Sequence, residues 1–390
     1  MKSTKDLIVR YEPFGGIIAT EHPPALTFVD KDFIKGLGFD VSSVWNKEWI
    51  GTYEAPIEAH YAITDFCNSN CSGCYMSSND QSKHQLHLDF YPSAKKIANH
   101  LISKKIFHVA LGGGESLAVP WIFDLAKYFK DNGVIPNLTT NGHYITDEIA
   151  KKCSIFGQVN VSLDHTVNDA VGVRPDDHFE KANEALKHLY NNNIRFGINC
   201  VVSKQNFDQL EEIVSYAKNM NVVDIELLRF KPTGRGKTVY QDYALDVDQA
   251  IELFPKLKKI SKKYKVSIKL DCSFTPFICS HKPSKKVMEY FAIMGCDAGN
   301  WLIGVTPQGD VSPCSFIEGS FFESNSLENE WDKDKTFIDF RNWDKETKTK
   351  CSTCAYVSIC KGGCHAVSHF LTGSFYEPDP ECPLIIKGLV

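Results

Sequence analysis

Apolar runs and amphipathic segments alternate along the middle of the chain. Between residues 57 and 273, six apolar runs indicate strands and six segments with a 3.6-residue period indicate helices. In 207–220, for example, Leu210, Ile213 and Val214 fall on one helical face. The expected strands are 58–64, 106–111, 135–140, 158–164, 195–203 and 224–230, and the expected helices are 93–105, 120–132, 146–155, 178–192, 207–220 and 246–264.

Six β–α repeats with short connections predict an α/β fold with a parallel sheet and helices outside it. Right-handed crossovers should curl that sheet into a partial (β/α)6 TIM-like barrel. A short N-terminal β extension precedes it, with strands expected at 7–11 and 17–20 and a helix near 30–36. After Ser273 the alternation stops and cysteines dominate. We therefore expect three parts: an N-terminal extension (1–56), a barrel (57–273), and a linker with a cysteine-rich domain (274–390).

Composition narrows the function classes. A net charge of −5 does not indicate nucleic-acid binding, and no apolar run reaches the roughly 20 residues of a membrane span. The start, Met1 to Asp6, lacks the apolar stretch of a signal peptide, so we expect a cytoplasmic protein. Because reducing compartments do not sustain disulfides, the 14 cysteines indicate metal binding.

Three of these cysteines, Cys67, Cys71 and Cys74, form a C-x3-C-x2-C motif directly after the first expected barrel strand. Thiolates hold iron–sulfur clusters, and a [4Fe–4S] cube normally takes four. Three close ligands leave one iron open to a small molecule. The alternatives are scattered core cysteines or a zinc knot, although zinc knots usually show C-x2-C pairs that close a four-ligand site.

Polar and glycine residues collect where the expected strands end, which is where ligands bind in α/β sheets. Gly113, Gly114 and Glu115 follow the second strand, although a glycine triplet alone is only a turn. For Ser162 and Arg174, around the fourth strand, the alternatives are a helix cap and a surface charge. Two further candidates for binding a ligand are Asn141, after the third strand, and Leu228, near the end of the sixth.

A second set of cysteines follows residue 273. Its seven members, in order, are Cys296, Cys314, Cys351, Cys354, Cys360, Cys364 and Cys382. A hairpin with Gly309 in its turn precedes Cys314. The remaining cysteines are Cys153 and Cys200, which we expect in the core, and Cys272 and Cys279, which are either core residues or extra ligands. His365 and His369 are read as polar cover over a cluster rather than as a metal pair.

The C-x3-C-x2-C motif resembles the signature of the radical S-adenosylmethionine (SAM) enzymes, and the seven cysteines resemble the SPASM domain that many of them carry. In that family the open iron chelates SAM, and reductive cleavage of SAM gives a 5′-deoxyadenosyl radical that abstracts hydrogen from the substrate. Gly73 stands where an aromatic residue often precedes the last cysteine, so Tyr75 is the candidate for the aromatic face. Ser116 replaces the usual proline after Gly-Gly-Glu.

The resemblance also assigns roles. It implies that Gly113, Gly114 and Glu115 hold the SAM ammonium group and that Ser162 and Arg174 hold its carboxylate. It further implies two auxiliary [4Fe–4S] clusters. Cys351, Cys354, Cys360 and Cys382 would form the outer group, and Cys296, Cys314 and Cys364 the inner group. With three thiolates, the inner cluster is expected to have an open iron, filled by water, by a substrate thiolate, or by Cys272 or Cys279.

SPASM-bearing relatives commonly modify peptides, so the resemblance predicts oxidative modification of a ribosomal peptide, such as a crosslink or a thioether. It implies a peptide substrate and a reductant such as flavodoxin or ferredoxin, and it makes a separate leader-binding protein a candidate partner. The alternatives are a sulfatase maturase, disfavoured because Ser315 replaces the usual aspartate, a small-molecule dehydrogenase or tetrapyrrole decarboxylase, and a non-catalytic electron carrier. No general base is identified; Glu226, Asp271 and Arg229 are considered.

Overall fold

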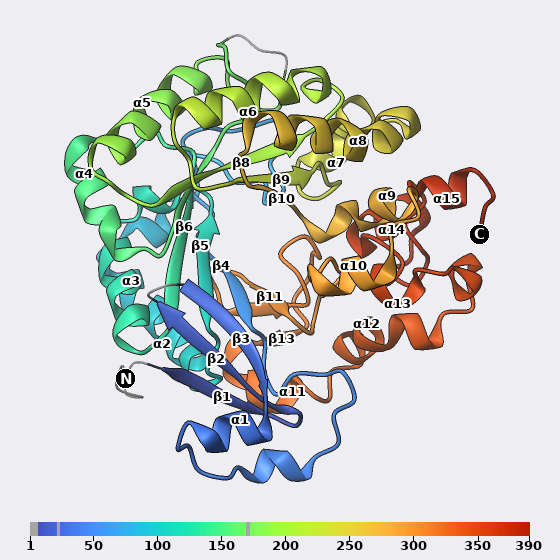
Figure 1. Cartoon of the computed structure of the whole chain (residues 1–390). Coiled ribbons are helices and arrows are strands. Elements are labelled where there is room, and N and C mark those ends of the chain that lie inside the picture. Colours follow the sequence, from blue (N-terminus) through green and yellow to red (C-terminus); the bar gives the residue numbers. More distant parts are fainter. Residues whose placement is uncertain (1–6, 22–23, 169–171) are drawn as a thin grey trace.

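The computed structural model describes residues 7–21, 24–168 and 172–390 (Figure 1). The first six residues, on which the expectation of no signal peptide rests, lie outside this range. Within the described ranges, no helix is long and apolar enough to cross a membrane.

A ten-stranded sheet forms the centre of the molecule, in the order β10-β9-β8-β7-β6-β5-β4-β11-β12-β13. Neighbours from β10 to β11 run parallel, and β12 and β13 add an antiparallel edge. The strands are β4 (Glu58–Thr64), β5 (His108–Gly113), β6 (Ile135–Thr140), β7 (Val159–Ser162), β8 (Phe196–Val202), β9 (Ile225–Arg229), β10 (Ile268–Leu270), β11 (Leu302–Val305), β12 (Asp310–Ser312) and β13 (Phe322–Glu323).

Helices cover the outer face of the parallel strands (Figure 1). Alternation along β4 explains this layering, because Ala59, Tyr61 and Ile63 are buried towards the helices while His60 and Ala62 stay half-buried on the inner face. The barrel helices are α2 (Tyr91–Ser103), α3 (Ile122–Asp131), α4 (Asp147–Lys152), α5 (His178–Asn191), α6 (Leu210–Asn219), α7 (Gly236–Tyr243) and α8 (Val247–Tyr264).

The predicted α/β fold with a partial barrel is confirmed, but the number of strands was too low. The sequence predicted six parallel strands, whereas β10 adds a seventh at one edge and β11 pairs in parallel with β4 at the other. β10 has only three residues, none of them fully buried, so it carries no recognisable apolar pattern. The sequence pattern also missed helix α7. Because β11 pairs with β4, the barrel sheet continues into the C-terminal region.

The N-terminal extension is a three-stranded antiparallel sheet rather than the expected pair of strands. It consists of β1 (Ile8–Glu12), β2 (Gly15–Glu21) and β3 (Pro24–Asp30), followed by α1 (Lys31–Gly36). Ile17 and Ala19 of β2 pack on Ile57 and Phe107 at the base of the barrel. The extension thus shares a small core with the barrel.

Short helices and turns make up the rest of the C-terminal region, drawn in orange and red in Figure 1. Such short elements are typical of a segment that is held together mainly by its cysteines rather than by a continuous apolar core. Its helices are α9 (Thr275–Cys279), α10 (Lys285–Tyr290), α11 (Leu327–Glu330), α12 (Lys335–Glu346), α13 (Val357–Cys360), α14 (His365–Thr372) and α15 (Pro383–Ile386).

Candidate functional site

The C-x3-C-x2-C loop follows the carboxyl end of β4, and two distant segments fasten it. Ser72 donates its backbone N–H to the carbonyl of Val173 at 2.9 Å. Arg235 donates from Nε to the carbonyl of Cys71 at 2.8 Å and from its backbone nitrogen to the carbonyl of Cys74 at 2.9 Å. The loop conformation is therefore set by tertiary contacts and not by the motif alone.

Glu115, at the end of β5, has a buried carboxylate with three donors. Thr140 donates its hydroxyl at 2.7 Å, and the backbone nitrogens of Asn141 and Leu117 donate at 2.7 and 3.0 Å. Burial nevertheless leaves the pKa of this carboxyl above its usual value. Because an ionised carboxylate has about four acceptor sites, one remains for a ligand such as an ammonium group.

The glycines before Glu115 allow a close approach of backbones. Gly113 has φ of +111°, a conformation that L side chains rarely adopt, and a Cβ on Gly114 would collide with the carbonyl of Phe66. In turn, Glu115 donates its backbone N–H to that same carbonyl at 2.7 Å. These glycines thus lock the end of β5 against the segment that leads into the cysteine loop.

Asn141 connects the end of β6 to the same loop. Its Nδ2 donates to Asn68 Oδ1 at 2.9 Å and to Ser69 Oγ at 2.7 Å. The ring of His143 continues this network, with Nδ1 3.2 Å from Nδ2 of Asn68 and Nε2 3.3 Å from Nδ1 of His178. Asn141 therefore positions the cysteine loop, a role that the sequence did not indicate.

Arg174 is partnered within the protein. Its Nε donates to the carboxylate of Asp164 at 2.6 Å, and Asp164 also accepts from the backbone nitrogen of Val201 at 2.8 Å. The guanidinium has five N–H donors, so this ion pair leaves some of them for a ligand carboxylate. Arg174 also lies close enough to Cys71 that its charge counters the rise in the thiol's pKa, which burial takes to about 11.

The remaining predicted contacts lie around the inner face of the sheet. Ser162 is half-buried on β7 and pairs in register with Asn199 of β8. The buried Oδ1 of Asn199 has no hydrogen-bond partner among the described residues, so it is a candidate ligand contact that sequence reasoning missed. Leu228 is half-buried on β9, and the ring of Tyr75 packs against Phe316, with centroids 5.0 Å apart.

The inner group of cysteines lies at the junction of the barrel and the C-terminal region. Cys364 is buried, and Cys296 and Cys314 pack against the same apolar cluster. Burial raises the pKa of the Cys314 thiol to about 11, with a further contribution from Cys364, and Cys314 and Cys364 likewise act on Cys296. The buried ammonium of Lys231 counters the rise for Cys314 and Cys364. Burial therefore favours neutral thiols here, and Lys231 is the cation that would favour their deprotonation when a cluster binds.

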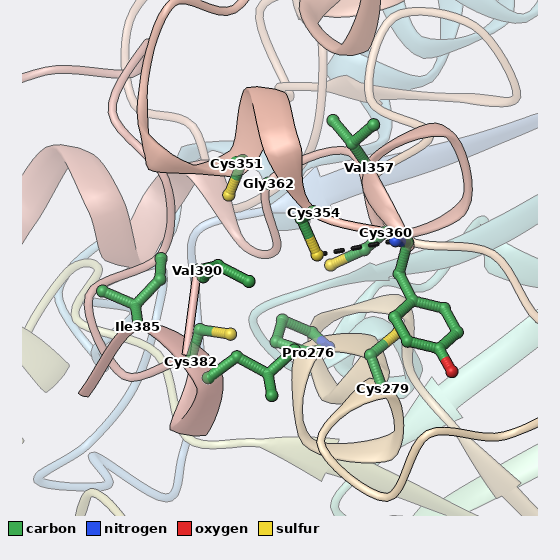
Figure 2. A pocket seen from close by; sticks show the side chains of 12 residues that line it. Pro276, Cys279, Cys351, Cys354, Val357, Cys360, Gly362, Cys382, Ile385 and Val390 are labelled. Carbon is green, nitrogen blue, oxygen red and sulfur yellow. Dashed lines mark hydrogen bonds between the residues drawn. The ribbon is translucent and has the colours of Figure 1, made fainter. Parts of the chain in front are cut away.

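The outer group of cysteines lines a cavity of about 350 Å³, a volume that includes its solvent-open mouth. Figure 2 shows the sulfurs of Cys351, Cys354 and Cys382 facing this space, and Cys360 also lies in the wall. Cys279, which the sequence left open, is a fifth cysteine of the lining and interacts with Cys360.

No three His, Cys, Asp or Glu side chains in the described ranges converge closely enough to hold a single metal ion. The donor set around the outer cavity is wholly sulfur, which fits the thiolate ligands of an iron–sulfur cluster.

A buried ion pair joins the barrel to the C-terminal region. Arg229, at the end of β9, donates to Asp379 at 2.5 and 3.1 Å and to Glu381 at 2.6 Å. Asp379 also accepts from the backbone nitrogen of Cys364 at 3.1 Å. Arg229 is therefore committed to this junction, which removes it from the groups considered as a general base.

Two sets of proton acceptors remain on the inner face. Glu226 makes no ion pair within the described ranges, and burial raises the pKa of its carboxyl. On β4, Nδ1 of His60 lies 3.0 Å from Oγ of Ser315, and its Nε2 lies 3.4 Å from Glu58. Asp271 is instead paired with Lys231 at 2.5 Å. Sequence reasoning missed the His60–Ser315 pair, because its members are 255 residues apart.

Comparison with known proteins agrees with this geometry. The model of the radical SAM superfamily matches residues 61–217, which hold the C-x3-C-x2-C loop, Glu115 and Arg174. The mycofactocin maturase MftC of Mycolicibacterium smegmatis is 30% identical over 342 residues, covering 84% of this chain and 83% of that protein. An AdoMet-dependent heme synthase of Methanosarcina barkeri is 28% identical over 357 residues, covering 85% and 98%.

The fold also matches solved structures. SuiB of Streptococcus suis bound to S-adenosylmethionine superimposes with a TM-score of 0.72 at 17% identity, covering 97% of this chain and 99% of that one. The complex of SuiB with its precursor peptide SuiA gives 0.71 at the same identity. At this level of identity, the match concerns the fold.

Proposed function

This chain belongs to the radical SAM superfamily, and from that premise we propose that it modifies a ribosomally made peptide oxidatively. It is an enzyme that uses a [4Fe–4S] cluster and SAM. The observation that carries the peptide proposal is the similarity to the mycofactocin maturase, which covers 84% of this chain and 83% of that protein.

We assign the SAM-binding cluster to Cys67, Cys71 and Cys74, and the auxiliary clusters to the inner and outer groups. A bound SAM cluster supplies the electron that cleaves SAM to a 5′-deoxyadenosyl radical. The protein's part is placement. The last free acceptor of Glu115 would take the SAM ammonium group, and the remaining donors of Arg174 would take its carboxylate, as charge-assisted contacts that orient the sulfonium.

The radical would remove one hydrogen atom from the substrate, and a net two-electron oxidation then releases one further proton and one electron. The proposed reaction therefore also needs a proton acceptor, and it needs an acceptor for the electron, which an auxiliary cluster would provide. Glu226 and the His60–Ser315 pair are suitable because they face the interior of the barrel sheet. A reductant of the flavodoxin or ferredoxin type and a separate leader-binding protein complete the proposed set of partners.

The test is anaerobic incubation of reconstituted enzyme with SAM, dithionite and synthetic peptides encoded by short reading frames beside its gene. We expect the formation of 5′-deoxyadenosine, together with a decrease in the mass of one peptide that corresponds to the hydrogen atoms removed. Replacing Cys67, Cys71 and Cys74 together with alanine should abolish 5′-deoxyadenosine while leaving iron in the C-terminal region. SAM cleavage with every peptide unchanged in mass would refute the peptide proposal.

A second candidate is decarboxylation of a tetrapyrrole, because the heme synthase similarity covers 98% of that relative. The two functions differ in what binds at the barrel mouth. A porphyrin absorbs strongly near 400 nm in a protein-bound form, so titration of the reconstituted enzyme with a carboxylated porphyrin distinguishes them. Carbon dioxide release from that substrate would replace the peptide proposal with this one.

A further inference from the structure

The inner group has three cysteines, Cys296, Cys314 and Cys364, whereas a [4Fe–4S] cluster normally takes four thiolates. Two cysteines outside the SPASM-like pattern, Cys272 and Cys279, are near enough in sequence to complete it. The tertiary structure separates these two, and the separation depends on β10, the strand that the sequence pattern did not reveal.

β10 carries Cys272 to the inner group. The strand runs parallel to β9, with Leu270 opposite Leu227, so Cys272 emerges at the carboxyl edge of the sheet together with Arg229. Asp271 caps the turn that follows, accepting from the backbone nitrogen of Ser273 at 3.0 Å. This cap fixes the direction in which the chain leaves the strand.

Contacts then link that turn to the inner group. Lys231 bonds to Asp271 at 2.5 Å, and its ammonium lies 4.2 Å from the centre of the Phe316 ring. Phe316 in turn donates its backbone nitrogen to the sulfur of Cys314 at 3.5 Å. One buried lysine therefore bridges the residue before Cys272 and the residue two positions after Cys314.

The electrostatic neighbourhood of Cys272 agrees with this placement. Cys296, Cys314 and Lys231 are among the charged groups that act on the Cys272 thiol. Cys272 is exposed although Ser273 and Phe274 beside it are buried, so its side chain is accessible to a ligand.

Cys279 is directed elsewhere. It lies on α9 in the wall of the outer cavity, where it interacts with Cys360 (Figure 2). The outer group already contains four thiols without it. Of the two cysteines left open by the sequence, only Cys272 is positioned to serve the inner group.

We propose that Cys272 is the fourth thiolate ligand of the inner auxiliary cluster, which then has no open iron. The proposal rests on the proposed function only in assuming that auxiliary clusters are present. The chain would supply two complete sets of four, Cys272, Cys296, Cys314 and Cys364 inside and Cys351, Cys354, Cys360 and Cys382 outside. A substrate thiolate then has no iron to bind at the inner cluster.

The experiment uses the full chain with Cys67, Cys71 and Cys74 all replaced by alanine, so that only auxiliary clusters remain. The protein is reconstituted, reduced with dithionite and treated with ¹³C-cyanide, which binds an open iron. The iron content per chain is measured, and pulsed electron–nuclear double resonance detects ¹³C coupled to a cluster. We expect about eight irons per chain, as two cubes require, and no ¹³C coupling.

Adding Cys272→Ala to that background should either produce a ¹³C coupling or remove about four irons per chain, whereas Cys279→Ala should do neither. A ¹³C coupling in the triple-alanine protein, before Cys272 is changed, would overturn the proposal. So would a count of about four irons per chain in that protein. An unaltered spectrum and iron count after Cys272→Ala would also overturn it. A failure of the proposed function is distinguishable, because it appears in the wild type as 5′-deoxyadenosine formed with every peptide unchanged in mass, while these results stay intact.

Discussion

At the scale of single residues, the site depends on charged groups that the protein has already partnered in part. Glu115 receives three hydrogen bonds and Arg174 is paired with Asp164, yet each retains capacity for one more partner. Such pre-organisation lowers the entropy lost when SAM binds, since neither side chain has to be ordered by the ligand.

Arg174→Ala should weaken SAM binding about tenfold to a hundredfold, because a charge-assisted hydrogen bond contributes about 1.5–3 kcal/mol. Calorimetry of SAM binding to the reconstituted enzyme measures the change. Lys263→Ala, which breaks an exposed ion pair with Glu211 on the outer helices, is the matched control and should leave the affinity unchanged. Equal affinities for Arg174→Ala and wild type would show that Arg174 does not contact SAM.

His178 should make stability depend on pH. Burial, with help from the charge of Arg174, lowers the pKa of its imidazole to about 3, while the unfolded value is about 6.5. Between those values the unfolded state binds more protons, so this contribution is full above pH 6.5 and declines as the pH falls towards 3. From pH 7.5 to 5.5 the loss is about 1.4 kcal/mol.

Urea unfolding of the apo protein at the two pH values tests this expectation. His178→Gln retains a donor for the carbonyl of Ser162, which Nε2 of His178 reaches at 2.8 Å, but does not titrate. The variant should therefore lose about 1.4 kcal/mol less than wild type on acidification. Parallel losses in both proteins would exclude His178 as the source.

At the scale of elements, the turn between β9 and α7 acts as a clamp on the cysteine loop. Arg235 donates to the carbonyls of Cys71 and Cys74, and Gly234 before it has φ of +55° and lies against the carbonyls of Cys74 and Tyr75. A residue with a Cβ at position 234 would press on both carbonyls. The position of the cysteine loop, which we propose binds the SAM cluster, thus depends on a turn 164 residues away.

Gly234→Ala should loosen the SAM-binding cluster. Gly373→Ala is the control. Gly373 has φ of +79°, so alanine there causes similar backbone strain, but nothing lies within 4 Å of the added Cβ, so no collision results. We expect faster loss of iron to a chelator in Gly234→Ala, followed by absorbance near 400 nm, and wild-type rates in Gly373→Ala. Similar rates in both variants would leave only backbone strain as the cause.

At the scale of the whole molecule, the C-terminal region and the barrel form one structure. β11 extends the barrel sheet beside β4, and Arg229 of the barrel pairs with Asp379, which also accepts from the backbone nitrogen of Cys364. This buried pair therefore connects the two regions at a cysteine of the inner group.

Asp379→Asn leaves Arg229 as a buried charge with only Glu381 as an anionic partner, and breaking such pairs costs about 3–5 kcal/mol. We expect a lower urea midpoint and faster proteolysis at the junction. Asp131→Asn, which affects an exposed pair with Lys127 on α3, should change the midpoint little. A midpoint for Asp379→Asn that equals that of Asp131→Asn would show that the pair contributes little to holding the two regions together.

The sequence alone determined the parts that depend on local pattern and spacing. The alternation of apolar runs predicted β4 and β6 at their exact residues, because long buried strands and amphipathic helices carry their period in the sequence. The cysteine spacing and the Gly-Gly-Glu element led to the radical SAM superfamily, since a cluster needs its thiolates close together in the loop that binds it.

Only the tertiary structure decided how distant segments meet. β10 is too short for a period and β11 belongs to another region, so neither could be assigned to the barrel sheet from sequence. The contacts of Asn141, Arg235 and Lys231 join residues far apart along the chain, and the different surroundings of Cys272 and Cys279 follow from those contacts. A side chain's partners across the fold depend on packing, which leaves no local signature in the residues themselves.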